Sequence, residues 1–420
     1  MFAKRTNWNL ETNRLSAALE AHRAAGKPLI DLTVSNPTEC EFQYDERTIL
    51  NALRNPASLK YEPNPRGLEV ARGAVCEYYA DRGAVHEYQE QRGSARENHE
   101  QRGVSISKED IFLTTSTSEA YSFAFRTLCN PDDGILVPEP SYPLFEFLAD
   151  IQDVRLARYP LVYDYGWQID FHALEQAITP RTRGIIVVHP NNPTGHFCRP
   201  HETRKLNEIC AAREIAIIAD EVFLDFSLNE KQPATFAANS NALTLTLSGI
   251  SKICGLPQMK AAWLIASGPE ARKSEALARL EVIADTYLSM NAPVQHALPV
   301  LLRQRDAFQR QVLARVRENL AELDKQLAAQ KLCTRLEVEG GWNVVIRVRA
   351  TRSDEELVLD LLAKKGVYVH PGHFYDFPSE GTVVVSLIAP RREFAEGIGR
   401  LLSTIQTQDE SGERNSNAIC

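Results

Sequence analysis

Short apolar runs that alternate with helical patterns are the feature that most constrains the fold of this chain. Each run has four to six residues and ends in a turn-forming or polar segment, which is typical of a buried strand. Five such runs occupy the middle of the chain: Gly134–Val137, Gly184–Val188, Ile215–Ala219, Ala242–Leu247 and Ala261–Ala266. Helical patterns such as Arg199–Arg213 lie between them, so the chain is predicted to form a mostly parallel sheet covered by helices.

Polar residues follow three of these strands at their carboxyl ends. Asn192, Asp220 and Lys252 each come shortly after an apolar run. In open α/β sheets, ligands bind in the crevice outside the carboxyl ends of the strands. We therefore expect these three side chains to lie close together in one site.

A second, smaller α+β domain is predicted after a long helical stretch at about 293–330. Its strands and helices are expected at Gly341–Arg349, Val367–His370, Thr382–Leu387, Ser353–Lys365 and Arg392–Thr404. We expect a large domain over residues 56–300 and a small domain made of residues 1–55 and 301–405. The polar segment 406–420 has few apolar side chains and is predicted to be disordered.

A ten-residue repeat interrupts the predicted large domain. Asp81-Arg82-Gly83 recurs as Gln91-Arg92-Gly93 and Gln101-Arg102-Gly103, with polar residues between the copies. The repeat is too short and too polar to form a solenoid. We interpret residues 82–103 as a surface insertion between a helix and the strand Ile111–Leu113, with partner binding as the one functional alternative.

Composition and charge exclude several classes of function. The net charge of −8 argues against a nucleic-acid partner, and no apolar stretch is long enough to suggest a membrane protein. The N-terminal segment has no apolar core, so no secretory signal is expected. The eight cysteines are scattered without a C-x-x-C pair or zinc spacing, which favours reduced thiols, no metal site and a cytoplasmic protein.

Lys252 is the first candidate for chemistry. The run Leu243–Leu247 ends in a Ser/Gly turn that leads to this single lysine. A lysine held in an apolar setting can lose its proton and act as a nucleophile that forms a Schiff base. Taken alone, the pattern also fits a solvated lysine at the end of a strand.

Six motifs occur in an order and spacing that resemble one enzyme family. They are Tyr61 with Gly67, Thr115–Ala120 (TSTSEA), Pro140–Pro143 (PSYP), Asn192–Gly195 (NPTG), Asp220-Glu221 and Ser251-Lys252. The set resembles the class I/II aminotransferases, which are fold-type I, aspartate aminotransferase-like enzymes dependent on pyridoxal phosphate (PLP). The resemblance covers residues 30–405 and implies an α/β fold with a large PLP-binding domain and a smaller α+β domain.

The resemblance implies a role for each residue around the cofactor. Lys252 would hold PLP as a Schiff base and, once freed, shuttle the substrate proton. Asp220 would keep the pyridine nitrogen protonated, and Asn192 would donate a hydrogen bond to the O3′ oxygen. Tyr142 would stack on the ring.

The phosphate would be held at a helix N-terminus, where backbone N–H groups attract anions. Taken as a bare sequence, the same serines and threonines also fit an ordinary helix cap. The resemblance assigns the phosphate contacts to five residues: Ser116, Thr117, Ser118, Ser251 and Lys260. Tyr61 resembles the family residue that reaches the phosphate of the neighbouring subunit, which implies a homodimer with sites at its interface.

Several positions depart from the family pattern. Phe223 stands where many members have a tyrosine that donates to O3′, and Lys260 stands where an arginine or similar basic residue commonly contacts phosphate. Lysine supplies charge there but no bidentate fork. Gly249 replaces a serine found in some members, so Ser248 or Ser251 is expected to substitute for it.

The arginine that clamps the substrate carboxylate in relatives would fall on Val384. Either other groups hold the carboxylate, or the substrate is not an ordinary α-amino acid. Arg391, Arg392 or Arg347 could reach into the site, with a solvated arginine as the alternative. The candidate substrate contacts are Ser35, Asn36, Trp342, Asn343 and Arg391, together with the loop Pro371–Tyr375.

The sequence therefore predicts a PLP-dependent aminotransferase that moves an amino group between an amino acid and a 2-oxo acid. A PLP-dependent lyase, synthase or decarboxylase is the main alternative, because a fold does not fix the reaction. A regulatory or binding role is a further alternative. That role usually comes with a DNA-binding extension or a lost catalytic lysine, and the sequence indicates neither.

Overall fold

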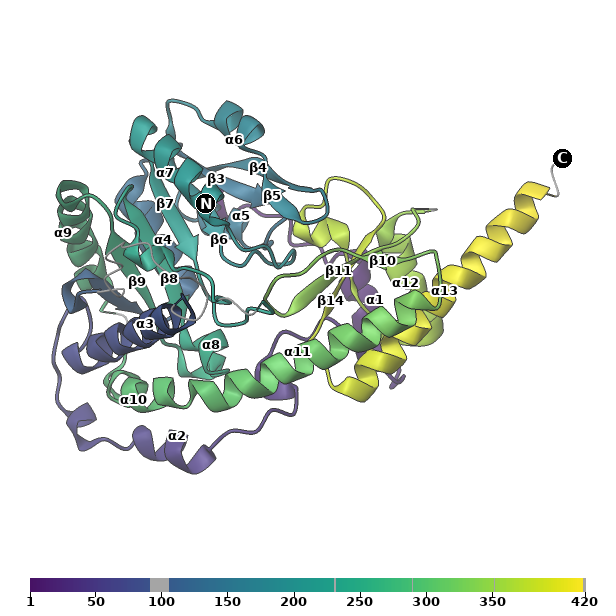
Figure 1. Ribbon diagram of the computed structural model, residues 1–420, viewed down its shortest axis with the longest axis horizontal. Helices are drawn as coiled ribbons and strands as arrows, with labels where there is room; N and C mark the ends of the chain where they lie inside the picture. The colour runs from purple at the N-terminus through teal and green to yellow at the C-terminus, as the bar shows by residue number, and fades with distance from the viewer. Residues whose placement is uncertain (91–105, 230–231, 289, 351, 418–420) are drawn as a thin grey trace.

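The computed structural model describes residues 1–90, 106–229, 232–288, 290–350 and 352–417 (Figure 1). A large sheet with its covering helices occupies one end of the molecule, and a smaller sheet with its own helices occupies the other. Within these residues, no helix is long and apolar enough to cross a bilayer.

An eight-stranded sheet forms the centre of the large domain. Its strands are β2 (Ile111–Thr114), β3 (Gly134–Glu139), β4 (Arg155–Tyr163), β5 (Trp167–Ile169), β6 (Thr182–Val188), β7 (Ala216–Asp220), β8 (Thr244–Gly249) and β9 (Ala262–Ser267). They lie in the order β2-β9-β8-β7-β6-β3-β4-β5. All pairs from β8 to β4 are parallel, whereas the pairs made by β9 and β5 are antiparallel. The mostly parallel sheet predicted from the apolar runs is therefore confirmed.

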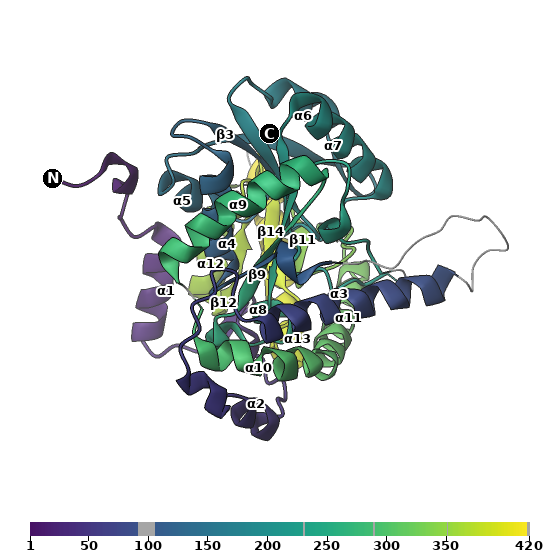
Figure 2. The ribbon, with the colours of Figure 1, turned by 90° about the vertical axis from the view of Figure 1, so that its left-hand side faces the viewer.

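Helices cover both faces of this sheet, because successive side chains of a strand point to opposite sides. Ile186 and Ile218 pack on one face, and their neighbours Ile185 and Ile217 pack on the other; all four are fully buried. The first face carries α4 (Thr117–Leu128), α5 (Phe145–Asp150) and α9 (Glu270–Tyr287). The second carries α3 (Glu69–Glu90), α6 (Phe171–Ala177), α7 (Pro200–Arg213) and α10 (Ala292–Arg303). Figure 2 shows α4 and α9 on one side of β9 and α3 on the other.

The small domain is built on a four-stranded antiparallel sheet. Its strands are β10 (Thr334–Arg335), β11 (Asn343–Arg347), β13 (His370–Pro371) and β14 (Thr382–Ser386), in the order β10-β11-β14-β13. Around them lie the parallel pair β1 (Ile30–Asp31) and β12 (Val367–Tyr368) and the helices α1 (Arg14–Ala24), α12 (Asp354–Lys365) and α13 (Arg391–Asn417). The long helix α11 (Arg305–Ala328) runs from the large domain to this sheet (Figure 1).

The first residues of the chain divide between the two domains. The pairing of β1 with β12 and the packing of α1 on α12 join the N-terminal segment to the small domain. In contrast, α2 (Glu46–Ala52) packs on α10, and its Ile49 belongs to the large-domain core. This contact favours a domain boundary before α2 rather than after residue 55.

Two predictions about irregular segments differ from the structure. Helix α13 continues to Asn417, so most of the segment 406–420 that was expected to be disordered is helical. The segment contains no proline and extends a helix already anchored by the buried side chains of Phe394 and Ile398. Arg82 was expected in an exposed insertion, but it lies in α3 and is largely covered, as the partner of Asp225 in an ion pair. The later copies of the repeat lie outside the described residues.

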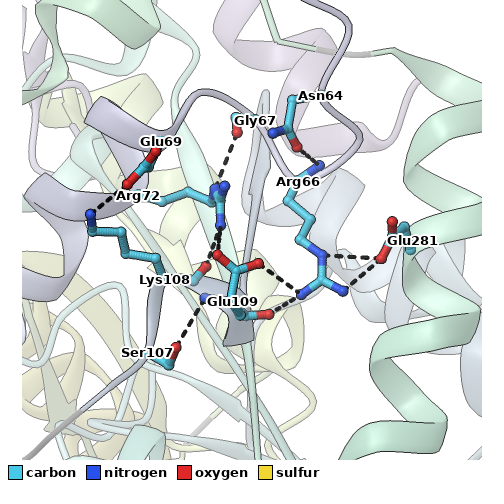
Figure 3. A network of polar contacts seen from close by, with 9 residues as sticks. All are labelled: Asn64, Arg66, Gly67, Glu69, Arg72, Ser107, Lys108, Glu109 and Glu281. Atoms are coloured by element: carbon cyan, nitrogen blue, oxygen red, sulfur yellow. Dashed lines mark hydrogen bonds and ion pairs between the residues drawn. The ribbon is translucent and has the colours of Figure 1, made fainter.

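A polar network joins the two chain segments that flank the insertion (Figure 3). Arg72 in α3 donates to the backbone oxygen of Lys108 (2.7 Å) and to the carboxylate of Glu109 (3.2 Å). Lys108 in turn donates to Glu69 (2.8 Å), next to the start of α3. Lys108 and Glu109 precede β2, so the network ties the first turn of α3 to the chain segment that leads into β2.

The Arg82–Asp225 ion pair is expected to contribute strongly to stability, because Asp225 is buried and only 13% of the Arg82 side chain is exposed. Asp225 also accepts hydrogen bonds from Tyr78 (3.0 Å) and Gln309 (3.0 Å). The Arg82→Met variant should lose about 3 kcal/mol of unfolding free energy, since it leaves a buried carboxylate without its cation. Denaturant unfolding of purified variants measures this loss.

The matched control is Arg155→Met, which removes an exposed ion pair with Asp132. That change should cost less than about 1 kcal/mol. Equal losses in the two variants would contradict the structural role assigned to Arg82.

Candidate functional site

A cavity of about 270 Å³ lies at the carboxyl ends of β6, β7 and β8, where the two domains meet. Nine of the predicted site residues line it: Ser35, Thr117, Tyr142, Asn192, Asp220, Ser251, Lys252, Trp342 and Asn343. Trp342 and Asn343 come from the small domain, so the cavity is completed only when both domains are in place.

Lys252 lies in a one-turn helix, α8 (Ile250–Ile253), directly after β8. Its Nζ donates to the backbone oxygen of Ser35 (3.4 Å) and lies 5.0 Å from the centre of the Trp342 ring. Burial lowers the pKa of the Lys252 amine to about 8, although the nearby charge of Asp220 acts in the opposite direction. The neutral, nucleophilic amine is therefore populated near neutral pH.

Asp220 is the last residue of β7, and its side chain is buried in the cavity wall. It accepts hydrogen bonds from the backbone N–H of Val222 (3.1 Å) and the hydroxyl of Tyr121 (2.9 Å). Burial raises the pKa of Asp220, while these two donors and the Lys252 amine favour its ionised form. Two hydrogen bonds therefore stabilise the ionised form of the Asp220 carboxylate in this site.

Asn192 is held in the cavity wall by its loop and by the small domain. The loop is closed by Gly195 N–H donating to Asn191 O (2.7 Å), and Gly195 has a positive φ of 72°. A Cβ at Gly195 would lie 2.5 Å from Val338, so glycine is required there. The Nδ2 of Asn343 donates to the Oδ1 of Asn192 (2.7 Å).

The N-terminus of α4 provides the predicted phosphate end of the site. Thr117, its first residue, lines the cavity, whereas the Ser116 hydroxyl caps the helix by accepting from Glu119 N–H (3.1 Å). Ser251 also lines the cavity. Ser248, the other candidate to replace the serine missing at position 249, is turned away and donates to Glu221 O (3.3 Å).

Aromatic rings form much of the remaining wall. Tyr142, with 41% of its surface exposed, lines the opening and packs edge-on against Phe145 with ring centres 6.4 Å apart. Phe223 packs edge-on against Trp342 with ring centres 5.2 Å apart. Phe223, which was predicted to stand in place of the family tyrosine, lines the cavity and offers it no hydroxyl.

Six predicted site residues do not line the cavity: Ser116, Ser118, Lys260, Tyr61, Asn36 and Arg391. Asn36 caps a short 3-10 helix, and its Oδ1 accepts from Thr38 N–H (3.2 Å). Lys260 and Ser118 are exposed, and Tyr61 is 75% exposed on the surface. The structure does not bring Arg391 to the substrate, because it pairs with Glu318 on the surface.

No arginine of the described part of the chain lines this cavity. Val384, at the position of the family arginine, is buried in a core cluster with Val345 and Tyr375. Arg347 lies outside the cavity and packs over the ring of Tyr163. Among the described residues that line the cavity, Asp220 is the only carboxylate and Lys252 the only lysine or arginine.

The sequence did not identify Tyr121 or His370 as site residues. In the sequence, Tyr121 has the pattern of an ordinary buried residue of a helix, and His370 is the last residue of a predicted strand, so neither position indicates a functional role. His370 lines the cavity and shares a hydrogen bond with the hydroxyl of Tyr375 (3.1 Å). Burial lowers the pKa of His370 to about 4, so its ring is neutral at pH 7. Phe374 and Tyr375, in the loop expected near the substrate, line the cavity too.

Comparisons with known proteins place this chain among aminotransferases. The chain is 25% identical over 363 residues to glutamate-pyruvate aminotransferase AlaA of Escherichia coli (strain K12), covering 84% of each chain. It is 26% identical over 404 residues to the alanine aminotransferase of Mycobacterium tuberculosis (strain H37Rv), covering 92% of this chain and 87% of that protein. The solved alanine aminotransferase from Pyrococcus furiosus shares the fold, with a TM-score of 0.85 at 21% identity over 97% of this chain and 100% of its own.

The sequence model of the family described as aminotransferase class I and II matches residues 60–391, which is most of the chain. The chain belongs to this family of PLP-dependent transaminases.

Proposed function

We propose that Lys252 holds PLP in this cavity and that the enzyme exchanges an amino group between an amino acid and a 2-oxo acid. The observation that carries the proposal is a lysine amine of lowered pKa that shares one cavity with a buried, hydrogen-bonded carboxylate. Structural ion pairs usually hold a lysine protonated, whereas this arrangement favours a reactive amine.

The groups that line the cavity fit PLP in chemistry and number. The Lys252 amine suits the aldehyde carbon, the Asp220 carboxylate suits the ring nitrogen, and the Asn192 amide suits the phenolic oxygen. The start of α4 at Thr117, with Ser251, suits the phosphate. Bound PLP would supply an electron sink for the negative charge that develops on the substrate carbon.

The side chains of this protein would position the substrate and move its proton. Lys252 Nζ would take the proton from the substrate Cα and deliver it to the C4′ carbon of the cofactor, on the other side of the amino nitrogen, as an amine with a pKa near 8 can do in both directions. Asp220 would hold a proton on the ring nitrogen, and Tyr121 would keep that carboxylate ionised by donating to it. The rings of Phe223 and Trp342 exclude water from the cavity wall next to Lys252.

A homodimer in the cytoplasm completes the proposal. Tyr61 is 75% exposed and lies outside the cavity of its own chain, and Leu59 and Leu288 near it are also exposed. This arrangement supports Tyr61 contacting the phosphate in the site of a second copy. All seven cysteines of the described residues are free thiols, which supports a reducing compartment.

Mixing the PLP-loaded protein with amino donors tests the reaction directly. The names of the relatives make glutamate and alanine the first donors to try and pyruvate the first acceptor. We expect a donor to convert the bound cofactor to its pyridoxamine form and release a 2-oxo acid. The Lys252→Ala variant should lose both this conversion and the visible absorption of the lysine-bound cofactor. A lysine-type visible band in Lys252→Ala would contradict the assignment, and decarboxylation or elimination products in wild type would favour the alternative reactions.

The Phe223→Tyr variant tests the missing hydroxyl. A tyrosine here would donate to the phenolic oxygen and stabilise its anionic form, a hydrogen bond worth on the order of 1 kcal/mol or more. We expect the pKa of the lysine–cofactor linkage to fall in the variant relative to wild type, as measured by spectrophotometric titration. An unchanged or higher pKa would show that Phe223 does not occupy the position of the family tyrosine.

A further inference from the structure

We propose that Asn343 is a positioning residue that orients the amide of Asn192 toward the phenolic oxygen of PLP. The proposal rests on the proposed function, because it concerns the electronic state of the cofactor held by Lys252. It assigns a role to a small-domain residue that was expected only to contact the substrate.

The hydrogen bond between the two amides has a defined direction. Asn343 Nδ2 donates to Asn192 Oδ1 at 2.7 Å, a short and strong geometry for an N–H···O bond. An amide has an acceptor end and a donor end, so fixing the Oδ1 of Asn192 also fixes where its Nδ2 points. Within the part of the chain that the structure describes, Asn192 Nδ2 has no hydrogen-bond partner, and Asn192 lines the cavity. The donor end is therefore available to a ligand.

The small-domain sheet holds Asn343 in place. Asn343 is the first residue of β11 and pairs with Ser386 of β14, which itself lines the cavity. Its neighbours in sequence, Trp342 and Val344, are buried. The backbone of this segment is tied down further by Leu387 N–H donating to Trp342 O (2.7 Å). Asn343 therefore presents its amide from a rigid strand rather than from a loose loop.

The absence of a hydroxyl at position 223 increases the importance of this orientation. Phe223 packs on Trp342 and has no donor for the phenolic oxygen. Asn192 is then left as the side-chain donor that the family pattern provides at that oxygen. If the amide turned over, its Oδ1 would face an anionic oxygen, and the attraction would become a repulsion. Asn343 opposes that rotation from the other side of Asn192.

A double-mutant cycle on the pKa of the lysine–cofactor linkage tests the proposal. The variants are Asn343→Leu, Asn192→Ala and the double variant, each loaded with PLP and titrated by its visible absorption. We expect Asn192→Ala to raise this pKa by about one unit, which corresponds to the loss of one charge-assisted hydrogen bond. Asn343→Leu should raise it by about half a unit or more. The double variant should match Asn192→Ala, because Asn343 acts only through Asn192.

Two further variants separate positioning from folding. Asn343→Ala removes the same donor without adding bulk, and it should shift the pKa as Asn343→Leu does. Asn239→Leu makes the same change at another asparagine contact, where Asn239 Nδ2 donates to Asn207 Oδ1 (2.7 Å) near the opposite end of β8. This control should lose thermal stability and leave the linkage pKa unchanged.

Three results would overturn the proposal. An unchanged pKa in both Asn343 variants, with only stability lost, would show a structural role. Additive shifts in the double variant would show that Asn343 acts on the cofactor directly. A wild-type protein without a titrating lysine-linked band would refute the proposed function itself, which distinguishes that failure from the first two.

Discussion

The hydrogen-bond register between β6, β7 and β8 is the constraint on which the site depends. Val188 pairs with Asp220, and Asp220 pairs with Leu247, so β6 and β7 end level at one edge of the sheet, and β8 continues past them to Gly249. Lys252 and Asn192 leave this edge within a few residues, which is why their side chains share a cavity with Asp220. A shift of β7 by one residue would turn Asp220 to the opposite face of the sheet and separate it from the lysine.

The small domain supplies the other half of the cavity. Trp342 lies 5.0 Å from the Lys252 amine, and Asn343 bonds to Asn192, so two consecutive residues at the start of β11 contact both groups that the large domain presents. Leu32 O accepts a hydrogen bond from Ser386 N–H (2.7 Å), which ties the N-terminal segment to the same strands. Because Trp342 of the small domain helps to bury the Lys252 amine, the lowered pKa of that amine depends on the small domain being in place.

The sequence predicted the features that depend on local pattern. The apolar runs correctly predicted strands of the large sheet. The positions of Asn192, Asp220 and Lys252 just after three of these strands correctly predicted that their side chains share one cavity. Features that depend on distant partners were missed. Tyr121 meets Asp220 across 99 positions, and Asn343 meets Asn192 across 151. Arg82 was expected to be exposed because its neighbours in sequence are polar. Instead it forms an ion pair with Asp225, which lies 143 positions later in the chain. Local periodicity contains no information about such contacts.

The central claim is that one lysine, Lys252, holds the cofactor. Reduction of the PLP-loaded protein with borohydride, followed by proteolysis and peptide mass spectrometry, locates that lysine without relying on any variant. We expect a pyridoxyl group on the peptide that contains Lys252, whose amine has its pKa lowered to about 8. A pyridoxyl group on the exposed Lys260, or on no lysine at all, would contradict it.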